Sequence, residues 1–407
     1  MNIKINPTKL KGYVNIPASK SIAHRMLICS ALANGKSIIG NINYSKDIEA
    51  TINAMKALGA EIFTDKNNAE INGIVHIPEK SVIDCNESGS TLRFIIPVAT
   101  ALGIKTEFHG RGRLPQRPID IYTRELSKHG ITFDYNNTMP FTVSGQLSNG
   151  IYEIEGNVSS QFITGLLFAL PLLNDDSEIV MTSHLESRPY VDITIDVLKK
   201  FGIIIEETGK GFHIKGNQTY KAYSGNVEGD FSQAAFFYVA NSLGSSIMLG
   251  NLNTNSVQGD KKIIEIINQT EQNGFFNADC SDIPDLVPVL AVLASFGKKT
   301  STIYNAERLK IKESNRLETT AELINNLGGD VKITSDGLII RPTNNMHGGT
   351  IESFGDHRIV MAGAVMATAL KEELIINGAE AVTKSYPDFF EDYKKLGGNV
   401  NVISMEQ

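Results

Sequence analysis

Leu198-Lys-Lys-Phe-Gly202-Ile-Ile-Ile205 contains the pattern that decides the fold. A helical segment ends at the glycine, and a strand-like run of β-branched residues follows at once. The pattern recurs six times, with its glycines at positions 59, 130, 202, 274, 328 and 397. All steps between them are 69 to 72 residues long except one of 54. A near-constant period of this size predicts a repeat of supersecondary units.

A second series, of apolar helices with polar first turns, keeps the same phase. Its predicted starts lie at or near Ser19, Ser88, Ser159, Asp230, Pro284 and Asp356. The step of 54 again falls between the fourth and fifth members. Because the two series share this irregularity, we expect six copies of one unit with two helices and several strands, the fourth copy shortened.

Apolar patterning predicts the layers of each unit. The runs at 163–173 and 286–296 are apolar nearly all round, so these helices should be buried. Second helices such as 47–58 and 313–327 are amphipathic by comparison, and strands such as 71–77 tend to alternate polar with apolar residues. We therefore expect an α/β fold with helices inside, sheets outside and three units in each of two domains.

The domain boundary is predicted near Val227. Units one to three begin with Ser, Gly, Lys and Arg residues, whereas units four to six begin with aspartates. The strand before Pro17 could belong to either domain, and we assign it to the second. The expected domains are 16–227 for units one to three, and 1–15 with 228–407 for units four to six.

Composition limits the classes of ligand and partner. The 407 residues carry a net charge of −7, which argues against a general binder of nucleic acid or anionic membranes. Cys29, Cys85 and Cys280 have neither metal-ligand nor redox spacing and suit a reducing compartment. Residues 1–7 lack the apolar region of a signal peptide. We expect a cytoplasmic monomer that needs no metal and no organic cofactor.

Charged residues gather at the helix starts. The stretch Pro17–Arg25 leads into an apolar helix and places Lys20 and Arg25 where the helix dipole disfavours cations, so an anion is the expected partner. The collected cations and carboxylates are Lys20, Arg25, Arg117, Arg316, Arg358 and Lys384, with Asp285 and Glu313. If the units of each half are related by pseudo-threefold rotation, these starts would converge, and the halves would face each other across a cleft.

A purely structural explanation competes at each of these positions. A loop Arg or Lys is usually solvated, and Ser159, Ser160, Asp285 and Asp356 could be helix caps only. Their repetition in phase favours a binding site. Two carboxylates amid cations are suited to general acid and base work. The residues thus predict a cofactor-free enzyme that acts on a small molecule with several negative charges.

Nine short motifs then identify a family. They are Ser19-Lys-Ser-Ile-Ala-His-Arg25, Ser88-Gly-Ser-Thr-Leu-Arg93, Gln116-Arg-Pro118, Ser159-Ser-Gln161, Ser187-Arg-Pro-Tyr190, Ile283-Pro-Asp285, Lys312-Glu-Ser-Asn-Arg316, Asp356-His-Arg358 and Lys384-Ser-Tyr-Pro-Asp388. In order and spacing they resemble the 5-enolpyruvylshikimate-3-phosphate synthase family along essentially the whole chain. The resemblance implies two domains, each an inside-out α/β barrel of three βαββαβ-type units, with the active site in the cleft between them.

The resemblance also implies the reaction. The enolpyruvyl group of phosphoenolpyruvate would pass to the 5-hydroxyl of shikimate 3-phosphate, with release of phosphate, by addition–elimination through a tetrahedral intermediate. The implied pathway leads to chorismate and the aromatic amino acids.

The family's site residues carry over motif by motif. Shikimate 3-phosphate would be held by Lys20, Ser21, Arg25, Ser159, Ser160, Gln161, Ser187, Tyr190, Asp285 and Lys312. Phosphoenolpyruvate would be held by Lys20, Gly89, Arg117, Gln161, Arg316, Arg358 and Lys384. The implied catalytic set is Asp285 as the base for the 5-hydroxyl, Glu313 as the acid for the methylene carbon, Lys20 and Lys384. Asn305 and Glu307 compete for the place of the family's substrate-binding Asn.

Two alternatives remain. UDP-N-acetylglucosamine enolpyruvyl transferase shares the fold and chemistry, but it usually carries a reactive Cys or Asp in the loop that matches Gly110–Arg117 and an Asn after the first Lys. This chain has neither feature, and Ser21 follows Lys20. A non-catalytic binder of phosphorylated metabolites is the other alternative. Asp285 and Glu313 speak against it, because carboxylates weaken anion binding.

Overall fold

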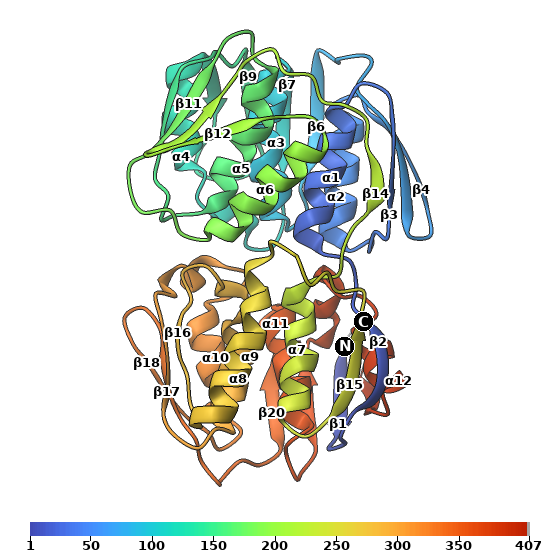
Figure 1. The fold of residues 1–407 in the computed structure, drawn as a ribbon, viewed down its shortest axis with the longest axis vertical. Helices are drawn as coiled ribbons and strands as arrows, with labels where there is room; N and C mark the ends of the chain where they lie inside the picture. Colours follow the sequence, from blue (N-terminus) through green and yellow to red (C-terminus); the bar gives the residue numbers. More distant parts are fainter. Residues whose placement is uncertain (405–407) are drawn as a thin grey trace. The chain divides into compact units, whose positions relative to one another are not determined.

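The computed structural model describes residues 1–404 and divides into two compact units (Figure 1). Residues 18–228 form one unit, which we call the inserted unit. Residues 1–17 and those from Gly229 onward form the other, which we call the discontinuous unit. Each unit has its own hydrophobic core. No helix within residues 1–404 has the length and apolar character needed to cross a membrane.

Three four-stranded sheets form the outer layer of the inserted unit. Their strand orders are β14 (Ser224–Asn226), β3 (Lys36–Gly40), β5 (Asn68–Asn72), β4 (Glu61–Asp65); β6 (Lys80–Asp84), β7 (Lys105–His109), β9 (Phe141–Gly145), β8 (Ile131–Asp134); and β10 (Ile151–Ile154), β11 (Ser177–Met181), β13 (Gly211–Ile214), β12 (Ile205–Thr208). In each sheet the first two strands are parallel, and the other pairs are antiparallel.

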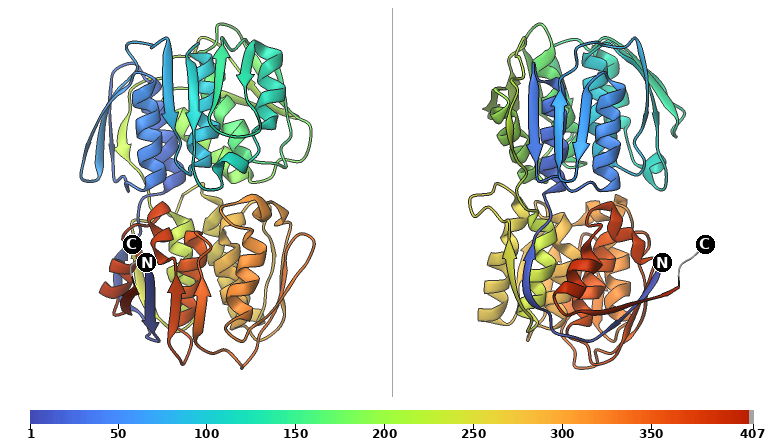
Figure 2. Two further views of the ribbon diagram at one scale, coloured as in Figure 1. Left: turned by 180° about the vertical axis from the view of Figure 1, so that it is seen from behind. Right: turned by 90° about the vertical axis from the view of Figure 1, so that its right-hand side faces the viewer.

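Helices fill the inserted unit (Figure 2). The first helices α1 (Lys20–Leu32), α3 (Gly89–Ala101) and α5 (Ser160–Ala169) are buried over nearly their whole length. The second helices α2 (Lys46–Ala57), α4 (Asp120–Glu125) and α6 (Arg188–Lys200) each bury one side only. Because buried helices must be apolar all round, the sequence pattern of each helix follows from its layer.

The discontinuous unit repeats this plan. Its sheets are β20 (Gly349–Glu352), β21 (Leu374–Asn377), β1 (Asn2–Asn6), β22 (Asn399–Ser404); β16 (Asn277–Asp279), β17 (Ser301–Tyr304), β19 (Leu338–Arg341), β18 (Asp330–Ile333); and the pair β15 (Ser246–Gly250), β2 (Lys11–Asn15). The buried helices are α7 (Phe231–Ser242), α9 (Val287–Ser295) and α11 (His357–Ala367), and the partly exposed ones are α8 (Ile263–Asn273), α10 (Arg316–Asn325) and α12 (Phe389–Lys395).

Three strands depart from the regular plan and show how the chain connects its repeats. β14 pairs in parallel with β3, and β2 pairs in parallel with β15, so the first and fourth copies exchange their first strands. β1 lies between β21 and β22, where the sixth copy would otherwise need a further strand of its own. The fourth copy has no hairpin after α8, which accounts for the short step in the repeat.

The repeat and the fold class are confirmed. The six glycines of the sequence pattern all have left-handed φ angles, between 79° and 106°, after their second helices. Only glycine adopts this conformation without steric cost, so it both ends the helix and starts the next strand. In a copy that has its own hairpin the order is β-α-β-α-β-β, so the second helix precedes the hairpin. The expected order βαββαβ is wrong in this respect.

Two predicted element bounds are wrong. β5 ends at Asn72 instead of reaching residue 77, because Gly73 passes so close to α1 that a Cβ there would lie 1.8 Å from the carbonyl oxygen of Ala33. α10 begins at Arg316 instead of 313. Residues 312–315 instead form a loop, in which Ser314 donates to Asp356 of the sixth copy and Glu313 accepts from Arg316 of the same copy.

A close helix contact in the inserted unit gives a test of this packing. A Cβ at Gly165 in α5 would lie 2.3 Å from the carbonyl oxygen of Arg93 in α3 and 2.3 Å from the hydroxyl of Tyr122. We expect Gly165→Ala to lower the free energy of unfolding by about 1–3 kcal/mol, because backbone must move to admit the methyl group. Chemical denaturation would measure this. Gly209→Ala is the matched control, since nothing lies within 4 Å of its Cβ position; equal stability of the two variants would contradict the close contact.

Candidate active site

The first helix start in the inserted unit carries an ion pair. Lys20 is the first residue of α1, and its Nζ lies 2.8 Å from Oδ2 of Asp47 in α2. The side chains of Lys20 and Asp47 are only 20% and 15% exposed, so solvent screens the pair less than it would at the surface. The neighbouring Ser19 hydroxyl is buried with no hydrogen-bond partner among residues 1–404. This end of α1 therefore holds a cation that an anion could share.

Arg25 lies one turn further along α1 and is buried. Its Nε donates to the Thr194 hydroxyl at 2.8 Å, and its Nη2 donates to the Tyr190 carbonyl oxygen at 2.9 Å. Its Nη1 donates to the Ser21 carbonyl oxygen at 2.6 Å. Burial is the main cause that lowers the pKa of Arg25 to about 10. Arg25 thus ties α1 to α6, and a ligand would compete with protein oxygens for it.

The second helix start brings Gly89 under a guanidinium group. The Ser88 hydroxyl caps α3 by accepting from the Thr91 N–H at 3.1 Å. A Cβ at Gly89 would lie 2.4 Å from Nη1 of Arg117, so the glycine leaves the room that this guanidinium occupies. Nε of Arg117 is buried and has no hydrogen-bond partner within the described residues. Backbone N–H groups and a cation meet here, as an anion site requires.

Gln161 links the third helix start to the second. Its Nε2 donates to the Ser90 hydroxyl at 2.9 Å, and its Oε1 accepts from Nη1 of Arg93 at 2.8 Å. Ser159 caps α5, because its hydroxyl accepts from the Gln161 N–H at 3.3 Å. The contact of Arg93 was missed from the sequence, although the residue belongs to one of the motifs.

The remaining predicted residues of the inserted unit lie at two helix starts. Ser160 is the buried first residue of α5. Ser187 precedes α6 with a left-handed φ of 54°, and Tyr190 lies in the first turn of the same helix. The left-handed backbone turns the chain sharply into α6, beside the residues that hold Arg25.

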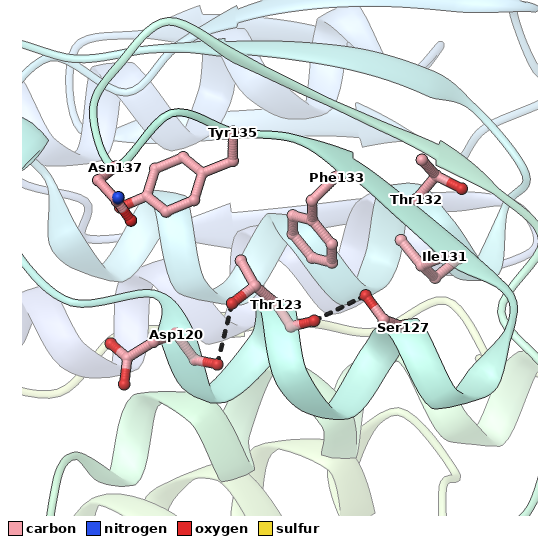
Figure 3. Close-up of a pocket in the computed structure, with 8 residues that line it drawn as sticks. All are labelled: Asp120, Thr123, Ser127, Ile131, Thr132, Phe133, Tyr135 and Asn137. Carbon is pink, nitrogen blue, oxygen red and sulfur yellow. Dashed lines mark hydrogen bonds between the residues drawn. The ribbon is translucent and has the colours of Figure 1, made fainter.

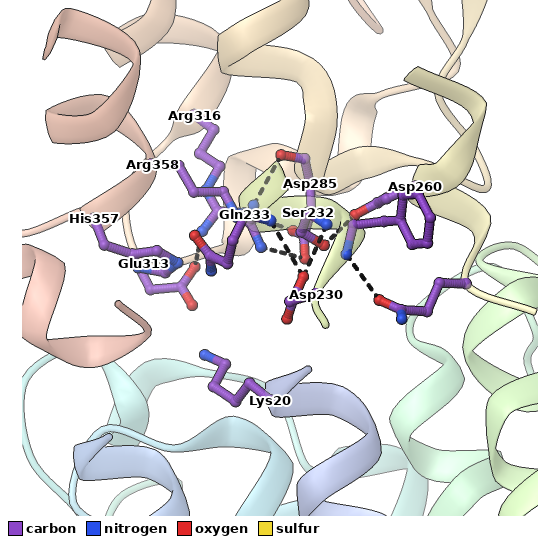
Figure 4. A network of polar contacts seen from close by, with 12 residues as sticks. Lys20, Asp230, Ser232, Gln233, Asp260, Asp285, Glu313, Arg316, His357 and Arg358 are labelled. Atoms are coloured by element: carbon purple, nitrogen blue, oxygen red, sulfur yellow. Dashed lines mark hydrogen bonds and ion pairs between the residues drawn. The ribbon is translucent and has the colours of Figure 1, made fainter. Parts of the chain in front are cut away.

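The discontinuous unit centres on Arg316, the first residue of α10 (Figure 4). Its side chain is 1% exposed and contacts three carboxylates. Nη1 lies 2.9 Å from Oδ1 of Asp285, Nη2 lies 2.6 Å from Oε2 of Glu313, and Nε lies 2.7 Å from Oδ2 of Asp356. The structure thus brings the predicted acid and the predicted base onto one guanidinium group.

Asp285 is held by a second guanidinium as well. Nη2 of Arg358 lies 2.9 Å from Oδ2 of Asp285, and Nη1 donates to its backbone carbonyl oxygen at 3.2 Å. Burial by itself disfavours the charged carboxylate, but Arg358, Lys312 and Arg316 outweigh burial and hold the pKa of Asp285 well below its usual range. In this state Asp285 is ionised and a weak base.

Asp356 accepts hydrogen bonds from the side chain of Arg316 and from the backbone N–H of Arg358. It is fully buried at the start of α11, where its carboxylate accepts from the Arg358 N–H at 3.0 Å and from the Ser314 hydroxyl at 3.0 Å. With the bond from Arg316 these contacts occupy both of its oxygens. Asp356 is therefore both a helix cap and the support of Arg316. From the sequence, Asp356 could have been a helix cap only.

Two lysines complete the predicted set in this unit. Lys312 has extended backbone just before α10, and burial, the largest cause, lowers its pKa to about 8. Lys384 donates from Nζ to the carbonyl oxygen of Gly355 at 2.9 Å. Asn305 donates its side-chain N–H to Asp279 at 2.9 Å. Arg316 and Arg358 already have carboxylate partners in this cluster, so a substrate anion would replace internal partners there.

A groove of about 560 Å³ lies elsewhere on the inserted unit (Figure 3). Its lining consists of Asp120, Thr123, Ser127, Ile131, Thr132, Phe133, Tyr135 and Asn137. It contains no arginine or lysine and none of the predicted site residues. The side chains that line this groove therefore offer no cation to an anionic ligand.

Comparison with known proteins gives consistent matches over the whole chain. The sequence pattern of the family described as "EPSP synthase (3-phosphoshikimate 1-carboxyvinyltransferase)" matches residues 5–393. Proteins named 3-phosphoshikimate 1-carboxyvinyltransferase from Clostridium kluyveri and Clostridium perfringens are 46% and 45% identical, covering 99% and 97% of this chain and 99% and 98% of their own lengths. The solved structure of EPSP synthase from Acinetobacter baumannii has a TM-score of 0.82 at 22% identity, covering 98% of this chain and 100% of that chain, which shows the common fold.

The match of the family pattern over nearly the whole chain agrees with the six-copy architecture, the paired carboxylates and the cationic helix starts described above. The chain belongs to the EPSP synthase (3-phosphoshikimate 1-carboxyvinyltransferase) family.

Proposed function

We propose how the residues of this chain divide the work of enolpyruvyl transfer. The chain is a transferase of the shikimate pathway, which leads to the aromatic amino acids. It transfers the enolpyruvyl group of phosphoenolpyruvate to shikimate 3-phosphate. The observation that carries the assignment of roles is the contact of Asp285 and Glu313 with the same guanidinium group.

Phosphoenolpyruvate is proposed to bind to Lys20, Gly89, Arg117, Gln161, Arg316, Arg358 and Lys384. Guanidinium groups match carboxylate and phosphate oxygens in pairs, which favours Arg316 and Arg358 for this task. The room that Gly89 leaves beside Arg117 supports a third cationic contact. Together these groups would offset the charge of a trianionic ligand.

Shikimate 3-phosphate is proposed to bind to Lys20, Ser21, Arg25, Ser159, Ser160, Gln161, Ser187, Tyr190, Asp285 and Lys312. Hydroxyl groups at three helix starts suit a phosphate group. Arg25 would act mainly by holding α1 and α6 in place, because its donors already serve protein oxygens.

Asp285 is proposed to remove the proton of the 5-hydroxyl group, and Glu313 to protonate the methylene carbon of phosphoenolpyruvate. A ligand that takes over Arg316 and Arg358 would release Asp285 from the cations that hold its pKa down. Asp285 would therefore become an effective base only once phosphoenolpyruvate has bound to Arg316 and Arg358. Lys20 and Lys384 would stabilise charge in the tetrahedral intermediate.

We further infer that the protein works as a cytoplasmic monomer with these two small molecules as its partners, without nucleic acid or membrane. The net charge of −7 supports the absence of polyanionic partners. The three cysteines are buried and unpaired, as in proteins of a reducing compartment.

The substrate assignment is tested by phosphate release from purified protein. We expect release from phosphoenolpyruvate when shikimate 3-phosphate is present, and none with phosphoenolpyruvate alone, because the hydroxyl group of the acceptor starts the reaction. UDP-N-acetylglucosamine is the control acceptor. Equal release with that sugar nucleotide, or no release with either acceptor, would overturn the assignment.

The role of Glu313 is tested by Glu313→Gln. We expect kcat to fall at least ~10²-fold, since the amide cannot donate the proton, while both substrates still bind. Steady-state kinetics and calorimetric binding would separate the two effects. Glu318→Gln, on the exposed side of α10, is the matched control and should retain full activity. Unchanged turnover in Glu313→Gln would exclude Glu313 as the acid.

The contact of Gly89 with Arg117 is tested by Gly89→Ala. The added methyl group would occupy the position of the guanidinium, so Arg117 must move. We expect the KM for phosphoenolpyruvate to rise roughly tenfold, the loss of about one charge-assisted contact. The Kd of shikimate 3-phosphate alone, measured by calorimetry, should stay the same. A larger change in that Kd than in the KM would contradict the assignment.

A further inference from the structure

A buried carboxyl group beside Asp285 has no part in the reaction as assigned above. Asp260 lies in the 3-10 turn η4 (Gly259–Lys262) that leads into α8, and it is 4% exposed. The Ser232 hydroxyl in α7 donates a hydrogen bond to its Oδ2 (Figure 4). Its Oδ1 is buried and has no hydrogen-bond partner among residues 1–404.

The groups around Asp260 are mostly acidic. Asp285 interacts with it from η5 (Pro284–Leu286), and Asp230 interacts from the start of α7. Asp230 is the cap of α7, since its Oδ1 accepts from the Ser232 N–H at 2.8 Å. Arg358 from α11 is the cation that acts on Asp260, and this guanidinium is also bonded to Asp285. Cys280 lies nearby as a neutral thiol whose pKa burial raises.

These surroundings favour the protonated form of Asp260. An ionised carboxylate with one oxygen buried and unbonded is costly, whereas the protonated form leaves only neutral oxygens in this buried place. Burial first, and then the charges of Asp285 and Asp230, raise the pKa of Asp260 to about 7 against the opposing effects of Ser232 and Arg358. Asp260 therefore loses its proton at a higher pH than an exposed aspartate does.

We propose that Asp260 is a positioning residue that sets the basicity of Asp285 through its own charge. When Asp260 loses its proton to solvent, its negative charge strengthens the affinity of Asp285 for the substrate proton. When Asp260 is protonated, this effect is absent and Asp285 is the weaker base. The inference rests on the proposed role of Asp285 in the transfer reaction.

The sign of the pH dependence follows. Turnover rises with pH as Asp260 ionises around pH 7, by roughly 3- to 10-fold, because a base strengthened by about one pKa unit passes on only part of that gain to the rate. Below this range the slow form with neutral Asp260 remains active. A residue with a merely structural role would change the rate equally at all pH values.

The test compares pH profiles of kcat with both substrates saturating. In Asp260→Asn we expect the rise around pH 7 to vanish and the rate above pH 8 to fall to the wild-type level at low pH, because the amide is permanently neutral. In Ser232→Ala we expect the rise to move to higher pH, because the hydroxyl that stabilises the anion is lost. Glu265→Gln, at an exposed position of α8, is the control and should keep the wild-type profile.

Several outcomes would overturn the inference. One is an Asp260→Asn profile that keeps the rise, or that is lowered by the same factor at every pH. Another is a Ser232→Ala profile that does not move, and this variant decides the matter alone if Asp260→Asn does not fold. Absence of any transfer by the wild-type protein would instead refute the proposed function, whereas transfer with profiles that neither substitution alters refutes only the role of Asp260.

Discussion

The buried guanidinium group of Arg316 is the interaction on which the discontinuous unit depends. An unpaired charge at 1% exposure would cost several kcal/mol, so the fold must supply partners for it. Those partners come from three places in the chain: Asp285 before α9, Glu313 before α10 and Asp356 at the start of α11. The charge therefore fixes the helix starts of neighbouring copies against each other. The same pairing brings together Asp285 and Glu313, for which the base and acid roles are proposed.

This pairing also explains why a site full of cations can exist in an acidic protein. Arg316 and Arg358 need no external counter-ion while the substrates are absent, because Asp285, Glu313 and Asp356 supply the negative charge. We propose that substrate anions exchange with these internal carboxylates. In the proposed mechanism, the cost of separating an ion pair would be coupled to the release of the base, so that substrate binding would also activate Asp285.

Much of the fold could be predicted from the sequence, because each copy of the repeat is marked by local features: a glycine after the second helix and an apolar run in the first helix. Glycines such as Gly202 must adopt left-handed angles to end a helix, and apolar runs such as 286–296 must be buried. Contacts between copies could not be predicted in this way. The bond between Arg93 and Gln161, and the use of β1 to complete the sixth sheet, depend on how separate copies pack. Sequence spacing places residues in phase but does not say which neighbour they bond.

In the candidate site, too, some residues could be predicted from the sequence and others could not. Residue types and helix starts led to Asp285, Glu313, Arg316 and Arg358, whose contacts in the structure are mutual. Asp260 was missed, because an aspartate after Gln258-Gly259 looks like a solvated turn residue until its burial is known. A signal was present, since the turn falls at the entry to the second helix of the fourth copy. Buried polar groups are recognised by what surrounds them, and the sequence does not show those surroundings.

The position of β1 has a consequence for how the protein is made. The inserted unit has all of its strands once residue 226 has left the ribosome, because β14 is the last of them. β1 is synthesised first, yet its partners β21 and β22 lie at 374–377 and 399–404. The first strand must therefore wait, unpaired, until nearly the whole chain has been translated. The discontinuous unit therefore has a strand made before the inserted unit, but its sheets can be completed only after all strands of the inserted unit have been made.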